Sequence, residues 1–223
     1  MNRYETVVSG GYQQAASTNK VLKNTYILLS GTLFFSAVMA MVSMALNVPP
    51  IAYMISVIAS MVLGMFVLPR TANSSSGIGV IFLVTGLLGF GLGPILSMYL
   101  ALPNGGQIVS TAFGGTGIIF LGLSGYALTS KRDFSFMGGF LFAGMMVLVV
   151  GMIANLFLQM PLLSLVVAGG IILVMSGFIL FDTSRIIRGG ETNYIMATYG
   201  LFLSLFNIFI SLLQILGIFG GDD

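Results

Sequence analysis

Asp182 is the acidic residue whose surroundings most favour a chemical role, because it directly follows a long apolar run. It lies in the stretch ILFDTSRIIRGGETNYI, which covers residues 179–195. The sequence has six acidic residues, and the others lie in the terminal segments or in polar loops: Glu5, Asp133, Glu191, Asp222 and Asp223. A carboxylate in apolar surroundings carries a free-energy cost. Asp182 is therefore the first candidate for a proton-linked or cation-linked site.

The residue types that are missing exclude most catalytic chemistry. The sequence contains no Cys and no His, so it offers no thiolate nucleophile, no imidazole base and no Cys or His metal ligand. An aspartyl intramembrane protease would need two aspartates within its spans, and Asp182 alone qualifies. We expect a protein that is not an enzyme and has no cofactor. Any proton-linked behaviour must then depend on carboxylates.

The composition of the chain determines what kind of element holds Asp182. Of 223 residues, 57% are hydrophobic and 6% are charged, whereas an ordinary soluble domain carries about 25% charged residues. A soluble fold of this size cannot bury so much apolar surface, so most side chains must be solvated by lipid. We expect an integral membrane protein whose partner is the lipid bilayer and not a nucleic acid.

Seven apolar runs are each long enough to cross a bilayer as a helix, which takes about 20 residues. Short breaks that contain Pro and Gly separate many of them, and these residues end helices. The sequence therefore predicts an all-α bundle of seven transmembrane helices. The expected spans are Asn24–Leu46, Ile51–Leu68, Gly77–Leu100, Gln107–Ser130, Phe134–Leu158, Leu162–Phe181 and Tyr194–Phe219.

The positions of the basic residues predict the orientation of this bundle. All eight Lys and Arg residues lie before the first span or after the second, fourth and sixth. The positive-inside rule assigns that side to the cytoplasm. We expect a cytoplasmic N-terminus and a periplasmic C-terminus. Residues 1–22 are expected to form a flexible cytoplasmic tail, residues 23–220 the membrane domain and residues 221–223 a short C-terminal tail.

Glycines in the third and fourth spans predict close helix packing. Gly86, Gly89 and Gly93 share one face of the third span, and the last two form a G-x-x-x-G pair. Such a pair allows two helix backbones to approach closely. The fourth span is also rich in glycine, at Gly114, Gly115, Gly117 and Gly122. We expect these faces to lie against neighbouring helices.

The last span carries small and polar residues at alternating steps of three and four, which places them on one helix face. This stripe consists of Ala197, Gly200, Ser204, Asn207, Ser211 and Gln214. A lipid-facing helix would not keep such a stripe, because each unpartnered polar group costs free energy. We expect this helix inside the bundle, with the stripe as a seam of interhelical hydrogen bonds or as the wall of a pathway.

Two structural roles compete with a functional role for Asp182. It shares a helix face with Arg185 at i, i+3 and can form a local ion pair, or it can face interfacial water at the end of its helix. In the functional alternative, the partly desolvated carboxylate is a proton-sensitive latch. Arg70, at another cytoplasmic helix end, is then its expected second partner.

A longer pattern around Asp182 resembles a known family. The segment FDTSRIIRGGETNYI followed by LFLSLFNIFISLLQILG resembles the signature of the Bax-inhibitor family, in which a D-T motif ends the sixth helix. The resemblance extends through GPILSMYL, SFMGGFLFAG and GMIANLFLQMP, so it covers nearly the whole chain beyond the tail. It implies a seven-helix bundle with the last helix at its centre, in a bacterial inner membrane.

The resemblance also implies a role for Asp182. Family members form pH-sensitive calcium leaks that use two aspartates near the cytoplasmic end, and the first of them matches Asp182. The second would lie in a pattern such as L-Y-L-D-x-x-N, which reads LFLSLFN here, so Ser204 takes its place. With one carboxylate the site cannot share a proton between two acids, and Ca²⁺ loses one charged oxygen ligand. Asp182 is then a lone calcium candidate, and Glu191 is the candidate substitute for the missing acid.

Bacterial proteins of this kind are also known as substrates and modulators of FtsH, the membrane-anchored AAA+ protease. The resemblance thus implies a protein that binds and restrains this protease and is itself degraded through its N-terminal tail. The alternative is a leak for Ca²⁺ or H⁺ that is gated around Asp182. Its wall would be the stripe at Gly200, Ser204, Asn207, Ser211 and Gln214. We favour the protease modulator, because the second carboxylate is missing.

Overall fold

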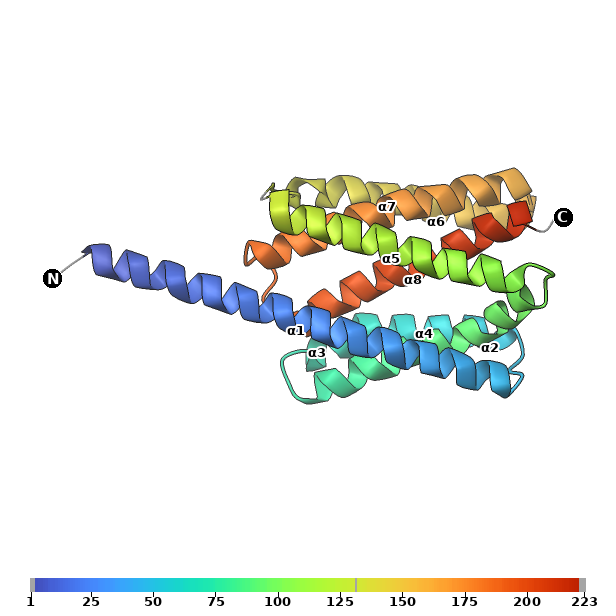
Figure 1. The fold of residues 1–223 in the computed structure, drawn as a ribbon, viewed down its shortest axis with the longest axis horizontal. Helices are drawn as coiled ribbons and strands as arrows, with labels where there is room; N and C mark the ends of the chain where they lie inside the picture. The colour runs from blue at the N-terminus through green and yellow to red at the C-terminus, as the bar shows by residue number, and fades with distance from the viewer. Residues whose placement is uncertain (1–2, 131, 221–223) are drawn as a thin grey trace.

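The computed structural model describes residues 3–130 and 132–220, with side chains from residue 18 onward, as an elongated bundle of helices (Figure 1). The helices run back and forth along one common direction. In chain order they are α1 (Arg3–Ala45), α2 (Ile51–Val62), α3 (Leu68–Thr71), α4 (Ser76–Leu100), α5 (Gly105–Ser130), α6 (Gly138–Leu158), α7 (Pro161–Ile187) and α8 (Tyr194–Gly220). A π-helical turn, Leu63–Val67, joins α2 to α3 within one span.

The described part of the chain contains seven helices that are long and apolar enough to cross a membrane, which confirms the predicted seven-span bundle. The first and sixth spans differ most from the expected bounds. The first begins at Thr18, and the sixth continues to Ile187. Asp182 therefore lies inside α7, which continues to Ile187, and not at the end of the helix as expected.

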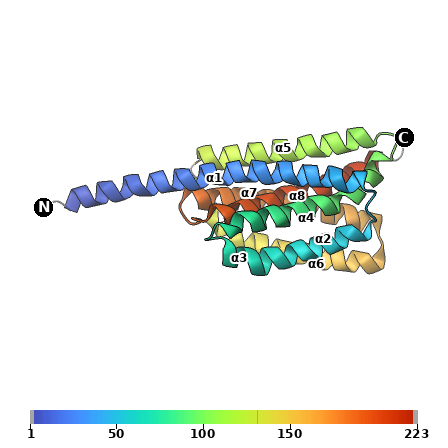
Figure 2. The same cartoon turned by 90° about the horizontal axis from the view of Figure 1, so that it is seen from below.

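The N-terminal segment, for which we expect a flexible tail, is helical from Arg3 onward. Helix α1 is continuous from Arg3 to Ala45, and its first part projects beyond the other helices (Figure 1, Figure 2). Extending a helix that already exists costs far less than nucleating one, so the first span can support this projection. The flexibility of the segment stays a prediction, and residues 221–223, the expected C-terminal tail, lie outside the described residues.

Helix α8 has the central position that its polar stripe predicted. It packs against α1, α4, α5 and α7, whereas α6 packs mainly against α7 and α2 mainly against α4. The large buried side chains of the main core cluster come from several helices and meet on α8, where Leu201, Phe202 and Ile208 are almost completely buried. The element that carries the stripe is thus surrounded by protein over much of its length.

Two glycines that follow α7 determine where the helix ends. The Gly190 N–H donates to the Arg185 carbonyl at 2.8 Å, and the Gly189 N–H donates to the Ile186 carbonyl at 3.2 Å. Gly189 has a φ of 73°, a left-handed conformation that a side chain disfavours. This arrangement is a Schellman motif, and it reverses the chain towards α8.

The start of α8 is determined by Asn193. Its Oδ1 accepts hydrogen bonds from the N–H groups of Ile195 (2.9 Å) and Met196 (3.1 Å), as an N-cap residue does. Its Nδ2 donates to the carbonyl of Ala72 (3.0 Å) and to Oδ1 of Asn73 (2.8 Å). One side chain therefore caps α8 and ties it to the loop that precedes α4.

The predicted glycine packing is confirmed for α4 and is wrong for most of α5. A Cβ added at Gly89 would overlap the Ser36 carbonyl oxygen of α1, and one at Gly93 would overlap the Ser43 hydroxyl. For α5, no described atom lies within 4 Å of a Cβ placed at three of the named glycines: Gly114, Gly117 and Gly122. These three glycines face away from the bundle, so they do not support a helix contact within the chain.

Candidate functional site

The carboxylate of Asp182 lies in the contact between α7 and α8. A Cβ placed at Gly200 of α8 would lie 2.8 Å from Asp182 Oδ2 and 3.5 Å from its Cγ. The absence of a side chain at Gly200 therefore provides the space that the carboxylate occupies. The Asp182 side chain is half-buried, so it neither faces lipid freely nor is sealed inside the bundle.

The Asp182 carboxylate forms neither an ion pair nor a hydrogen bond with any described residue. The local pair with Arg185, one of the two structural alternatives, is not formed, and Arg185 Nη2 lies 3.5 Å from Glu191 Oε2. The same guanidinium donates to the Gly190 carbonyl at 3.2 Å and lies 5.4 Å from the centre of the Phe181 ring. Arg185 and Glu191 still act on Asp182 electrostatically, as a nearby pair of opposite charges.

Two further predicted partners of Asp182 have other contacts. Arg70 is exposed, and its Nη1 donates a hydrogen bond to the Phe66 carbonyl of its own helical segment. The structure does not bring Arg70 to Asp182. Glu191 is held by Arg185 and by the Asn193 N–H, which donates to Glu191 Oε1 at 2.9 Å. Glu191 is thus near Asp182 but is already engaged.

The polar stripe of α8 begins at the Asp182 contact and runs towards the opposite end of the bundle. The Ser204 hydroxyl donates to the Gly200 carbonyl at 3.1 Å, and Asn207 Nδ2 donates to the Leu203 carbonyl at 2.8 Å. Both bonds lie within α8. The predicted seam of interhelical hydrogen bonds is therefore not formed at these two positions, although Ser204 and Ser211 are both buried.

A pocket with polar and apolar lining residues lies at the far end of the stripe. Gln214 lines a pocket of ≈ 510 Å³ together with Tyr99, Asn155, Gln159 and Ser164. Asn155 organises this region, because its Oδ1 accepts a hydrogen bond from the Met160 N–H at 3.0 Å. The stripe thus runs along α8 from Gly200, at the Asp182 carboxylate, to Gln214 at the pocket.

The described residues contain no group of three or more acidic, His or Cys residues that could hold a metal ion. Ca²⁺ takes six to eight oxygen ligands. If Ca²⁺ passed Asp182, carbonyl, hydroxyl or water oxygens would therefore have to provide the remaining ligands.

The sequence analysis missed three polar residues on α7, on α8 and directly before α8. Thr183 is completely buried, and its Oγ1 has no hydrogen-bond partner among the described residues. A Cβ placed at Gly64 would overlap the hydroxyl of Tyr199, the neighbour of Gly200, so this phenol fits into the π-helical turn of the second span. Asn193 could have been found, since Asn directly before an apolar run is a typical N-cap. The contacts of Thr183 and Tyr199 depend on how the helices pack, which no local pattern encodes.

Comparisons with known proteins identify relatives over the whole chain. Residues 18–221 match the family described as inhibitor of apoptosis-promoting Bax1. An uncharacterized membrane protein of Vibrio cholerae is 50% identical over 211 residues, which cover 95% of each chain. A protein of Escherichia coli K12, named modulator of FtsH protease YccA, is 47% identical over 220 residues, which cover 98% of this chain and 100% of the relative. An uncharacterized protein of Pseudomonas aeruginosa is 44% identical over 224 residues and covers 100% of both chains.

The location and the family follow from these relatives together with the fold. A relative from a second Escherichia coli strain, also 47% identical over 220 residues, is named an inner membrane protein. The seven apolar helices and this match indicate a multi-pass protein of the bacterial inner membrane. Because the family match extends over nearly all of the described residues, the chain belongs to the Bax-inhibitor family of membrane proteins.

Proposed function

We propose that this protein binds the membrane-anchored AAA+ protease FtsH and restrains it, and that the protease also degrades the protein through its N-terminal segment. The observation that carries the proposal is the full-length match, at 47% identity, to the relative that is named a modulator of this protease. Such a match across all seven spans supports a shared role more strongly than a match of one motif would.

The N-terminal part of α1 is suited to engagement by such a protease. An AAA+ motor needs a segment that it can unravel, and residues 3–17 project beyond the rest of the bundle (Figure 1). A helix shorter than about 12–15 residues is marginally stable in water without packing partners. The segment also contains Gly10 and Gly11, each of which weakens a helix by about 1 kcal/mol relative to Ala. Unravelling this segment therefore costs little free energy, whereas extracting the apolar spans costs far more.

A non-enzymatic role is consistent with the residue inventory. The chain has neither His nor Cys, and the described carboxylates do not form a catalytic pair. In this proposal the protein acts by occupying the protease. The protease binds the N-terminal segment readily but extracts the apolar bundle slowly, so it is less available to other substrates.

Deleting residues 3–17 tests the N-terminal route. We expect a longer half-life of the chain in the presence of FtsH and weaker co-purification with it. A matched control replaces the same residues with a Gly/Ser segment of equal length, which should restore degradation if only an accessible handle is needed. Unchanged half-life and unchanged association after the deletion would contradict this part of the proposal.

A pH-sensitive cation or proton leak is the second candidate function, and one observation favours it. Asp182 places a carboxylate without an ion pair against Gly200, at the start of the polar stripe that leads to the pocket at Gln214. Flux of Ca²⁺ and of protons into proteoliposomes, compared between acidic and neutral pH, tests this role. A leak should be altered by Asp182→Asn and much less by Asp133→Asn, since Asp133 is an exposed carboxylate that is paired with Arg188. Equal flux in all three proteins would exclude gating by Asp182.

A further inference from the structure

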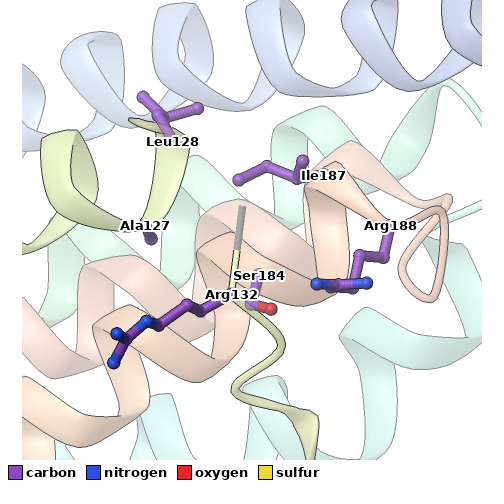
Figure 3. Close-up of a pocket in the computed structure, with 6 residues that line it drawn as sticks. All are labelled: Ala127, Leu128, Arg132, Ser184, Ile187 and Arg188. Carbon is purple, nitrogen blue, oxygen red and sulfur yellow. The ribbon is translucent and has the colours of Figure 1, made fainter. Parts of the chain in front are cut away.

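A second polar site lies at the end of the bundle that carries Asp182, between the last turns of α5 and α7. It is a pocket of ≈ 180 Å³ (Figure 3). Its lining combines cationic, hydroxyl and apolar groups, contributed by Ala127, Leu128, Arg132, Ser184, Ile187 and Arg188. None of these residues takes part in the α7–α8 contact at Gly200, so the pocket is a separate feature.

The polar groups of this pocket are donors. Ser184 is 1% exposed, and its Oγ accepts the Phe134 N–H at 3.1 Å, but its own hydroxyl proton has no acceptor among the described residues. Arg132 is exposed, and its guanidinium forms no ion pair with a described side chain. Figure 3 shows the Arg132 and Arg188 guanidinium groups on opposite sides of Ser184. A group with several acceptor oxygens would complement this arrangement.

One carboxylate lies near these donors. Asp133 Oδ1 is 3.6 Å from Arg188 Nε, and the Asp133 side chain is 55% exposed. The two side chains form an exposed ion pair, whose charges water screens. The two guanidinium groups of Arg132 and Arg188 outnumber this one carboxylate, so the described charges around the pocket sum to a positive value.

We propose that this pocket binds the phosphate group of an anionic phospholipid. The apolar residues Ala127, Leu128 and Ile187 belong to membrane-spanning helices, so the pocket lies where a phospholipid headgroup meets its acyl chains. Basic pockets between transmembrane helices recognise anionic headgroups in this way. A free phosphate ion would use the same donors but would gain nothing from the apolar wall.

Lipid retention measured by native mass spectrometry tests the proposal. The full-length protein is purified in detergent, supplemented with phosphatidylglycerol or phosphatidylethanolamine, and scored for the fraction that retains a bound lipid. Wild type should retain phosphatidylglycerol in preference, and Arg132→Gln should lower that retention about fivefold, the effect of one basic residue at an anionic membrane surface. Arg70→Gln is the matched control, because Arg70 lies at the same end but binds its own helix.

A second variant and a competitor distinguish the remaining outcomes. Ser184→Ala removes the hydroxyl donor and should lower retention as well, with thermal unfolding in lipid-free detergent measured alongside to detect a folding defect. Equal retention by wild type and Arg132→Gln, or no preference for phosphatidylglycerol, would overturn the proposal. Displacement of the lipid by inorganic phosphate at similar concentration would overturn the lipid assignment and indicate a phosphate site instead.

Discussion

The contact between α1 and α4 and the contact between α7 and α8 both depend on glycine, but they differ in what the glycine accommodates. In the first, a Cβ at Gly89 would overlap the backbone carbonyl of Ser36. In the second, a Cβ at Gly200 would meet the end of the Asp182 side chain, with Oδ2 2.8 Å away. One glycine brings two backbones together, whereas the other provides space for a charged group.

This difference separates structural packing from a site that can change. A backbone-to-backbone contact has one arrangement, because neither helix can move without losing its neighbours. A carboxylate against a glycine can move by rotating its side chain, and its charge can be removed by a proton. The contact between α7 and α8 is thus the place where a change of charge could alter helix packing, while the contact between α1 and α4 is expected to stay constant.

Gly89→Ala should have the largest effect on stability. The new methyl group overlaps a backbone oxygen, so α1 and α4 must separate, and overpacking of this kind costs about 3 kcal/mol. The free energy of unfolding in detergent would show the loss. Ser36→Ala added to this variant should restore little, because the carbonyl oxygen, the atom nearest to the new methyl group, remains. Gly114→Ala, on the open face of α5, is the control and should be neutral or slightly stabilising.

Gly200→Ala should have a smaller effect that can be reversed. The methyl group displaces the Asp182 carboxylate, at an expected cost of about 2 kcal/mol. Asp182→Ala in the same chain removes the obstructing atoms, so the double variant should be more stable than the sum of the two single changes predicts. A double-mutant cycle measures this coupling. Strict additivity would show that the contact between Gly200 and Asp182 does not control the packing of α7 and α8.

Asn193→Ala should lower stability by about 1 kcal/mol, the usual cost of losing an N-cap side chain. This variant tests whether the capped start of α8 is needed to keep Gly200 in contact with Asp182. Ser75→Ala is a matched control, because Ser75 occupies the same position before α4 without a side-chain cap hydrogen bond. Chemical denaturation of the three proteins compares them. An equal loss in both variants would mean that the cap itself contributes nothing.

Asp133→Asn should have the smallest effect, and it should depend on pH. The backbone N–H of Ser135 donates a hydrogen bond to the carboxylate, and this bond, with help from the Ser135 hydroxyl and Arg188, lowers the pKa of Asp133 below its usual value. The stabilisation is therefore complete at neutral pH and is lost as the pH falls through the lowered pKa. Thermal unfolding should show a slightly lower Tm for the variant at neutral pH, and the difference should shrink as the pH falls through the lowered pKa of Asp133. A difference that grew in acid would have the wrong sign.

The features that the sequence predicted well are those that depend on one helix at a time. Hydropathy alone defines the seven spans, and the steps of three and four along α8 identify the face that turns inward. The Schellman turn at Gly189 and Gly190 was also within reach, since a Gly pair directly after Arg188 is a common helix stop. These are local properties, and neighbouring helices do little to change them.

The features that the sequence did not predict depend on the mutual position of two helices. Gly114, Gly117 and Gly122 resemble the α4 glycines in spacing, yet they face open space, because composition does not indicate whether a partner helix is present. The contact between Asp182 and Gly200 requires the relative register of α7 and α8. Arg70 lies at the expected end but on a different part of the bundle, and proximity to the membrane surface alone could not place it beside Asp182.

The most direct test of the proposed role is the rate at which purified FtsH degrades a second membrane protein in proteoliposomes that also contain this chain. We expect the rate to fall as the chain is added, and to fall less when residues 3–17 are deleted. The protein would then restrain the protease by occupying it. A rate that stays constant at every ratio of chain to protease would contradict the proposal and leave the leak at Asp182 as the function to pursue.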